Sequence, residues 1–375
     1  MKKFRVGILF GGRSGEHEIS LLSAASVFKA IDQNKYEVVP IGITKDGRWL
    51  TSADAERLLT GKPLEHEHER KLRAGDPEAT SAAAVLHSGE AIVVPPEPHK
   101  PGTSMTPFQS DAPARRASDR AINVDVIFPV LHGTFGEDGT IQGLLEILQI
   151  PYSHSGTLAS ALAMQKDVAK VVMADAGVAV PDGIVVSRRE AAKSHALPPP
   201  YVIKPIAEGS SVGVFIVTED HSHPPQELTR HDWPYGERLL CERYIAGKEL
   251  TCAVLGDNAL GVIEIVPAVK FYDYEAKYAP GGSKHLLPAP LKPNVYQEVR
   301  RLALLAHQAL GCRGVSRADF RYDDRMDGTQ GLVCLEINTQ PGMTETSLVP
   351  ELAAHSGMTF EELVRWMVED ASLDR

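Results

Sequence analysis

The sequence predicts a chain of the α/β and α+β classes, with a doubly wound parallel sheet first and two α+β domains after it. Three observations predict this. A length of 375 residues exceeds what one hydrophobic core usually supports. The chain opens with an apolar run that ends in glycines and leads into apolar residues at helical spacing. From about residue 183, short β-rich runs alternate with glycine-containing turns.

The N-terminal domain is expected to cover residues 1–153. Its strands are "RVGILFGG", "EVVPIGI" and "NVDVIFPVLHG", and its helices are "ISLLSAASVFKAID" and "GTIQGLLEILQ". Between them, residues 51–121 are polar, charged or proline-rich, and we interpret this segment as an irregular excursion.

The second and third domains are expected at residues 154–241 and 242–375. "SALAMQKDVAKVVMADAG" predicts one helix closed by Gly177, and "VPDGIVVS" predicts a strand. The runs "YVIKP", "VGVFIVT", "RLLCERYI" and "KELTCAVLG" suggest a small antiparallel sheet. The last domain would contain "ALGVIEIVP", the long helix "NVYQEVRRLALLAHQALG", two further strands and two terminal helices.

Composition excludes several classes of protein. A formal net charge of -10 argues against binding to duplex nucleic acid, which needs clustered lysine and arginine. No apolar run approaches the roughly 20 residues that cross a bilayer. The 4 cysteines form no C-x-x-C pair, which fits a reducing compartment. We therefore expect a cytoplasmic protein that does not bind membranes.

The stretch "IKPIAEGSSVGVFIV" contains a formal G-x-S-x-G from Gly209 to Gly213. A nucleophilic Ser211 would need a helix directly after this turn. The residues from Val214 onward are β-branched and aromatic, which favours a hairpin whose glycine-rich tip closes over an anion. A hairpin loop without function and a serine hydrolase using Ser211 remain alternatives.

Two later segments, "VSRADFRY" and "GLVCLEIN", predict strands that carry oxygen donors. Period two puts Arg317, Asp319 and Arg321 on one face of the first strand. On the second strand, Glu336 and Asn338 share a face, while Val333, Leu335 and Ile337 would bury the other. Oxygen donors without histidine or cysteine suit Mg²⁺.

Seven blocks in order resemble the D-alanine-D-alanine ligases of the ATP-grasp superfamily. They are "GGRSGEHEIS", "LHGTFGEDGTIQG", "AMQKDVAK", "VIKPIAEGSSVGV", "KFYDYEAKY", "SRADF" and "EINTQPGMTETSLVP". The resemblance covers nearly the whole chain and weakens only across 51–121. It implies an ATP-grasp fold in which the second and third domains sandwich ATP, and a D-alanyl phosphate intermediate on the way to D-alanyl-D-alanine for peptidoglycan synthesis.

The resemblance also implies roles for individual residues. Two magnesium ions, with Mn²⁺ as an alternative, would be held by Asp319, Glu336 and Asn338. The catalytic set would be Glu16, Ser210, Tyr278, Arg317 and Gly342. Substrate D-alanine would contact His132, Ser347 and Leu348. ATP would be bound by Lys166, Lys204, Glu208, Ser211, Glu242, Arg243, Tyr244, Ile245, Glu249 and Lys277.

Three alternatives stay open beside this one. A ligase of the same fold could use D-lactate or D-serine as acceptor, a serine hydrolase could use Ser211, and a nucleotide-binding module could lack catalysis. The tyrosine-rich "YDYEAKY" segment favours the dipeptide product, since relatives that make D-alanyl-D-lactate tend to lack it. A homodimer is the expected assembly.

Overall fold

The computed structural model describes residues 3–51, 90–93, 103–107, 122–267 and 282–373. These residues form two compact units. The first contains residues 1–157, 313–315 and 340–375, and the second contains 158–312 and 316–339. The three sequence domains do not match these units one to one, and the division into three domains stays a prediction.

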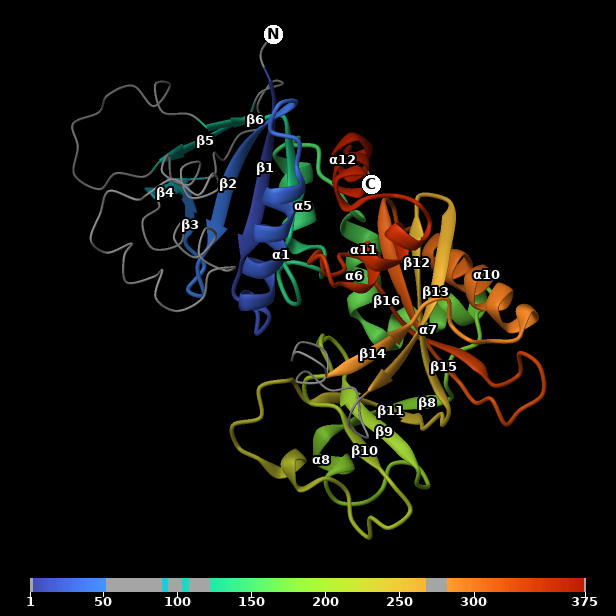
Figure 1. Cartoon of the computed structure of the whole chain (residues 1–375). Coiled ribbons are helices and arrows are strands. Elements are labelled where there is room, and N and C mark those ends of the chain that lie inside the picture. The colour runs from blue at the N-terminus through green and yellow to red at the C-terminus, as the bar shows by residue number, and fades with distance from the viewer. Residues whose placement is uncertain (1–2, 52–89, 94–102, 108–121, 268–281, 374–375) are drawn as a thin grey trace. The chain divides into compact units, whose positions relative to one another are not determined.

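The first unit is built on a sheet whose strand order is β6-β5-β4-β3-β2-β1-β7. β1 (Phe4–Gly11) pairs in parallel with β2 (Tyr36–Ile43) on one side and with β7 (Val126–Pro129) on the other. The helix α1 (His17–Ala30) connects β1 to β2, and α5 (Thr140–Ile147) follows β7 (Figure 1). This is the parallel α/β core that the sequence predicts.

Side chains alternate between the two faces of β1, so neighbouring residues contact different helices. Phe10 packs edge-to-face on Phe28 of α1, with ring centroids 5.7 Å apart. Leu9 belongs to the cluster that contains Ile141 and Leu145 of α5. Both faces of β1 are therefore buried, which explains its continuous apolar run.

The excursion at residues 51–121 is not wholly irregular where the structure describes it. β4 (Glu90–Val93) and β5 (Thr103–Pro107) join β3 (Trp49–Thr51) and β6 (Ile122–Val124) as antiparallel extensions of the sheet. These strands are only 4 and 5 residues long and lie in a segment rich in polar residues and proline, so the sequence analysis missed them. The first unit is completed by α11 (Leu348–His355) and α12 (Phe360–Asp370).

The second unit begins with two helices where one was predicted. α6 (Thr157–Met164) and α7 (Lys166–Asp175) are separated at Gln165, whose ψ of 87° is not helical. The apolar periodicity continues across this residue, so the break gave no signal in the sequence. Its effect is to make Lys166 the first residue of a helix.

A four-stranded antiparallel sheet follows, in the order β10-β9-β11-β8. Its strands are β8 (Gly183–Ser187), β9 (Tyr201–Pro205), β10 (Phe215–Val217) and β11 (Arg238–Arg243), with the short helices α8 (Arg188–Ala191) and η2 (Gln226–Thr229) beside them. The predicted small antiparallel sheet is confirmed, except that "KELTCAVLG" forms β12 of the next sheet.

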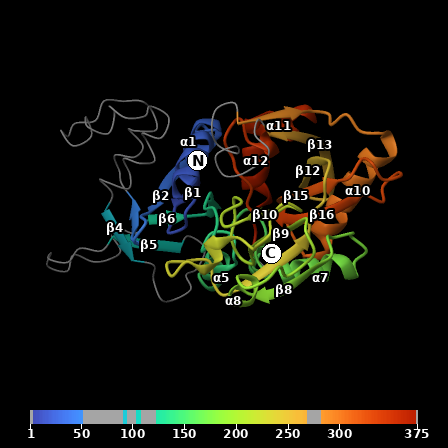
Figure 2. The ribbon, with the colours of Figure 1, turned by 90° about the horizontal axis from the view of Figure 1, so that it is seen from below.

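The five-stranded sheet has the order β14-β13-β12-β15-β16. It contains β12 (Lys248–Leu255), β13 (Asn258–Pro267), β14 (Ser283–Leu286), β15 (Val315–Tyr322) and β16 (Leu332–Asn338). The long helix α10 (Pro293–Ala309) lies along it (Figures 1 and 2). One core cluster joins α6, α7 and α10 to this sheet. Among the helices of the described ranges, none is long and apolar enough to cross a membrane.

Candidate functional site

The helix α7 presents two lysines one turn apart. Lys166 is its first residue and Lys170 lies four positions further, so both side chains lie on the same helix face. The backbone N–H of Lys166 donates to the carbonyl of Ile206, 3.1 Å away, just after β9. The start of α7 is thereby tied to the four-stranded sheet.

Lys166 joins two of the segments that the sequence analysis singled out. Its Nζ donates to the backbone carbonyl of Glu208 at 2.6 Å and lies 3.3 Å from Oε2 of Glu336. Glu208 is in the loop between β9 and β10 (residues 206–214), which we call the glycine-serine loop, and Glu336 is on β16. The predicted phosphate lysine therefore contacts both the loop and a predicted metal ligand.

A second cluster is buried between α7, β9 and β11. Glu242 Oε1 lies 2.7 Å from Lys170 Nζ, and its Oε2 lies 2.6 Å from Lys204 Nζ. The residues Glu242, Lys170 and Lys204 are 2%, 7% and 8% exposed, respectively. Since Lys204 pairs with Leu240 across β9 and β11, Lys204 and Glu242 point to the same face of the sheet.

The electrostatics of this cluster favour an ionised carboxylate. Burial opposes ionisation of Glu242, but the neighbouring Lys204 and Lys170 bring its pKa below the ordinary value. Burial, together with the positive charge of Lys204, lowers the pKa of Lys170. With both lysines protonated, the cluster carries two positive charges and one negative charge, which leaves a net positive charge.

The predicted metal ligands lie on paired strands. In the register of β15 and β16, Asp319 is opposite Glu336, and Arg317 is opposite Asn338. Oδ1 of Asp319 also accepts a hydrogen bond from Thr251 Oγ1 of β12, at 2.7 Å. The three predicted oxygen donors therefore share one face of the sheet, as expected from the sequence.

The opposite face of β16 differs from the prediction. Asp319 is paired with Glu336 but Phe320 is paired with Cys334, so Leu335 is an extra residue in a β-bulge. Leu332, Cys334 and Ile337 belong to the core cluster, whereas Leu335 is half-buried. The prediction that Val333 and Leu335 share the core face with Ile337 is wrong, because the bulge reverses the alternation within the strand.

The segment predicted to line a nucleotide base is anchored by Arg321. Its Nε donates to the carbonyl of Ile245 at 3.0 Å, and its Nη1 lies 3.3 Å from Oε2 of Glu249. The guanidinium carbon lies 5.9 Å from the centroid of the Tyr244 ring. Arg321 thus holds three of the predicted ATP-binding residues in place. The sequence analysis placed Arg321 on the strand face of Asp319 but gave it no role.

The glycine-serine loop connects two antiparallel strands. β9 ends at Pro205 and β10 begins at Phe215, and the two strands pair directly. Ser210 and Ser211 have φ values of 49° and 60°, in the left-handed region. The hairpin prediction is confirmed. The strand-to-helix turn that a nucleophilic Ser211 needs is absent at this described loop.

Glu208 is a loop residue whose carboxyl group has a raised pKa. Burial raises the pKa of its carboxyl group, and the positive charge of Lys166 only partly offsets this. A carboxylate here therefore gains from a nearby cation.

The predicted substrate residues of the first unit lie in a connected set of loops. Glu16 precedes α1, and Ser14 Oγ accepts from its backbone N–H at 3.2 Å and donates to the carbonyl of His132 at 2.5 Å. Ser23 Oγ lies 3.2 Å from His132 Nε2 and accepts from the N–H of Met343. The buried Ser23 therefore ties His132 to the segment that contains Gly342.

Ser347 and Leu348 lie at the start of α11. Ser347 is the residue before the helix, and its Oγ accepts from the backbone N–H of Thr344 at 3.0 Å. A side chain added at Gly342 would meet that Oγ at 3.2 Å, so the two positions are neighbours. The predicted Lys277 and Tyr278 lie outside the described residues.

Sequence reasoning missed Lys170, Thr251 and Ser23. Lys170 had one available signal, since it follows Lys166 by four residues on a predicted helix. Thr251 and Ser23 are small hydroxyl residues within apolar runs, and only their three-dimensional partners reveal them. Sequence spacing carries no such information.

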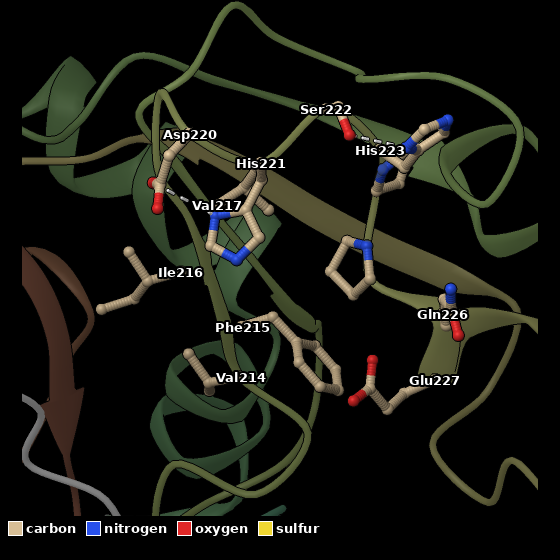
Figure 3. Close-up of a pocket in the computed structure, with 12 residues that line it drawn as sticks. Val214, Phe215, Ile216, Val217, Asp220, His221, Ser222, His223, Gln226 and Glu227 are labelled. Atoms are coloured by element: carbon tan, nitrogen blue, oxygen red, sulfur yellow. Dashed lines mark hydrogen bonds and ion pairs between the residues drawn. The ribbon is translucent and has the colours of Figure 1, made fainter.

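A separate hollow lies along the edge strand β10 (Figure 3), lined by residues 214–217 and 220–227. Ser222 Oγ and His223 Nδ1 are hydrogen-bonded at 2.8 Å, and Asp220 lies 3.8 Å from His221 Nδ1. Its lining includes none of the sequence-predicted site residues that the structure describes. The hollow is therefore distinct from the site around Lys166, Lys204 and Glu336.

Two family models match this chain, one after the other. Residues 5–155 match the family model described as the D-ala D-ala ligase N-terminus, and residues 172–369 match the model described as the D-ala D-ala ligase C-terminus. A relative from Azorhizobium caulinodans named D-alanine–D-alanine ligase is 52% identical over 370 residues, covering 99% of this chain and 99% of its own length.

Solved structures resemble the whole chain as well. The VanG D-Ala:D-Ser ligase from Enterococcus faecalis is 30% identical, with a TM-score of 0.75 over 98% of this chain and 99% of its own. The D-alanine–D-alanine ligase from Bacillus anthracis complexed with ATP is 26% identical, with a TM-score of 0.63 over 99% of this chain and 97% of its own.

Proposed function

Because this chain belongs to the D-alanine–D-alanine ligase family, we propose that it uses ATP to join two D-alanines into D-alanyl-D-alanine, a peptidoglycan precursor. The relative that matches over its full length is named for this reaction. The D-Ala:D-Ser ligase is only 30% identical. D-Alanine is therefore the favoured acceptor over D-serine or D-lactate.

The position of Lys166 is the observation that carries this proposal. Its Nζ contacts the glycine-serine loop at the carbonyl of Glu208, and it contacts β16 at the carboxylate of Glu336. A triphosphate needs cationic groups and a metal on the same phosphoryl oxygens. One lysine that reaches both the loop and the metal face supplies this arrangement, with Lys204 as the second phosphate ligand.

The donors on β15 and β16 fit magnesium. Two carboxylates and one amide offer oxygen atoms only, which suits a hard cation that keeps several waters. Asp319 and Glu336 now lie against the cationic groups of Arg317 and Lys166, so both positions already favour positive charge. We propose that Asp319, Glu336 and Asn338 hold the Mg²⁺ ions, which would neutralise charge on the phosphates.

We propose for the remaining residues the roles that the family resemblance implies. Glu16 would hold the ammonium group of the first D-alanine, with His132 near its carboxylate. Ser347 and Leu348 would receive the carboxylate of the second. Arg317 and the N–H of Gly342 would stabilise the oxyanion of the tetrahedral intermediate, while Ser210, Ser211 and Glu249 would position ATP.

The reaction then has two steps. An oxygen of the first carboxylate attacks the γ-phosphorus of ATP, which forms D-alanyl phosphate and releases ADP. The amine of the second D-alanine attacks the acyl carbon, loses a proton and displaces phosphate. A homodimer and a cytoplasmic location, which the sequence suggests, stay predictions.

Phosphate release from ATP with Mg²⁺ tests the proposal. D-Alanine, L-alanine, D-alanine with D-serine and D-alanine with D-lactate are supplied in turn, and the products are identified by mass. We expect release that requires D-alanine and yields the dipeptide at neutral pH. A mixed product formed in preference would change the acceptor, and folded protein without ATP turnover would overturn the proposal.

A further inference from the structure

Lys170 is a buried cation to which the proposed reaction assigns no task. Its side chain is 8% exposed, on the α7 face that also carries Lys166. Burying a lysine is costly unless the charge is paired. Its ion partner is Glu242 Oε1, at 2.7 Å. The cost of burial suggests that this charge serves the site.

Glu242 divides its carboxylate between two lysines. Oε1 lies against Lys170, and Oε2 lies 2.6 Å from Lys204. The lysines reach it from different elements, Lys170 from α7 and Lys204 from β9. Lys204 is therefore one partner of a carboxylate that already has another.

We propose that Lys170 is a positioning residue for ATP, which holds Glu242 so that Lys204 can exchange that carboxylate for a phosphate oxygen. This inference rests on the proposed function, in which Lys204 binds the triphosphate. When Lys204 turns to the nucleotide, Lys170 still neutralises Glu242 in the protein interior. Without Lys170, the same movement would leave a buried carboxylate without a cation, which is strongly unfavourable.

The charge count leads to the same result. With Lys170 and Lys204 both protonated, two lysines around one carboxylate leave one net positive charge, which attracts an anion to the cluster. Replacing Lys170 by a neutral residue makes the cluster neutral and gives Lys204 a full counter-ion of its own. ATP would then compete with Glu242 for Lys204.

Isothermal calorimetry of Mg·ATP binding, without D-alanine, tests this directly. We expect Lys170→Met to raise the Kd for Mg·ATP at least tenfold, while Lys170→Arg stays within about threefold because it keeps the charge. In turnover assays Lys170→Met should raise the KM for ATP and leave the KM for D-alanine within about threefold. Should Lys170→Met fail to fold, Lys170→Gln replaces it.

Lys248→Met is the matched control. Lys248 forms an ion pair with Glu264 at 2.7 Å in the same unit, and neither residue belongs to the proposed site. It should lower thermal stability without changing the Kd for Mg·ATP. A merely structural role for Lys170 would likewise lower stability alone.

The outcomes separate this inference from the proposed function. Wild-type protein that binds no Mg·ATP would overturn the proposed function. Wild-type binding with an unchanged Kd in folded Lys170→Met would overturn only the role of Lys170. Equal losses in Lys170→Met and Lys170→Arg would also overturn it, because the charge would then not be what matters.

Discussion

The guanidinium of Arg317 forms a bidentate pair with Asp319, two residues away on the same strand. Nε donates to Oδ1 at 2.9 Å and Nη2 donates to Oδ2 at 2.7 Å. Both side chains are about 15% exposed, so water screens the pair only weakly. A proposed oxyanion group and a proposed metal ligand are thus held together before any substrate binds.

We expect Arg317→Lys to lower kcat by roughly 10²- to 10³-fold, the usual cost of losing one transition-state donor. Lysine keeps the charge but lacks the planar fork that fits a carboxylate. Steady-state kinetics checks this. Arg301→Lys is the control, since Arg301 forms a similar fork with Glu298 on α10, and it should keep full activity.

Glu336→Gln should abolish turnover and leave the fold intact. The carboxylate is proposed to bind cations, and its side chain is 29% exposed, so the free energy of unfolding should change by less than about 1 kcal/mol. Phosphate release and thermal unfolding, measured together, check both parts. Glu298→Gln should retain activity, and an active Glu336→Gln would remove Glu336 from the metal site.

Gly213→Ala should destabilise the protein and weaken ATP binding through the glycine-serine loop. Gly213 has a φ of 69°, and an added Cβ would lie 2.9 Å from Tyr235 Cδ2 and 3.0 Å from Pro205 Cγ. Gly236→Ala is the control, because its φ is 79° and an added Cβ meets nothing within 4 Å. The control should lose only the left-handed backbone cost of about 1–2 kcal/mol.

Denaturant titrations of both variants check this comparison. The loss of stability should be larger in Gly213→Ala than in Gly236→Ala, and only the former should raise the KM for ATP. Equal losses would show that Tyr235 and Pro205 do not constrain the loop.

Glu208→Gln should stabilise the protein at neutral pH. Burial raises the folded-state pKa of Glu208 above the ordinary value of 4.5. An ionised Glu208 therefore weakens folding at pH values above its folded-state pKa, and this penalty disappears as pH falls below about 4.5. The contact with Lys166 uses the backbone carbonyl of Glu208, so the substitution keeps it.

Urea unfolding between pH 4 and 8 checks the sign. The gain from Glu208→Gln should be present at pH 7 and shrink toward zero at the acid end. A gain that grows with acidity would contradict the raised pKa.

Local patterns predicted the parallel core of the first unit, the glycine-serine hairpin and the convergence of Asp319, Glu336 and Asn338 on one face of two adjacent strands. Within each strand or helix, the period of the pattern fixes the face that a residue occupies. The sequence analysis missed the helix break at Gln165 and the β-bulge at Leu335. At both positions the apolar pattern of the sequence continues, and no glycine or proline marks the irregularity. The partners of Glu242 were missed because they come from separate elements.

The bulge at Leu335 makes β16 a strand with two orientations. Before it, residues 332 and 334 face the core, and after it residue 337 does, while Glu336 and Asn338 face outward. Without the bulge, Leu335 would take a regular place in the strand, and simple alternation after Cys334 would turn both donors into the hydrophobic interior. Deleting Leu335 would instead leave a regular strand that still carries Glu336 and Asn338 on its outward face. Shortening the strand by this one residue is therefore a change in length that the two donors can accept.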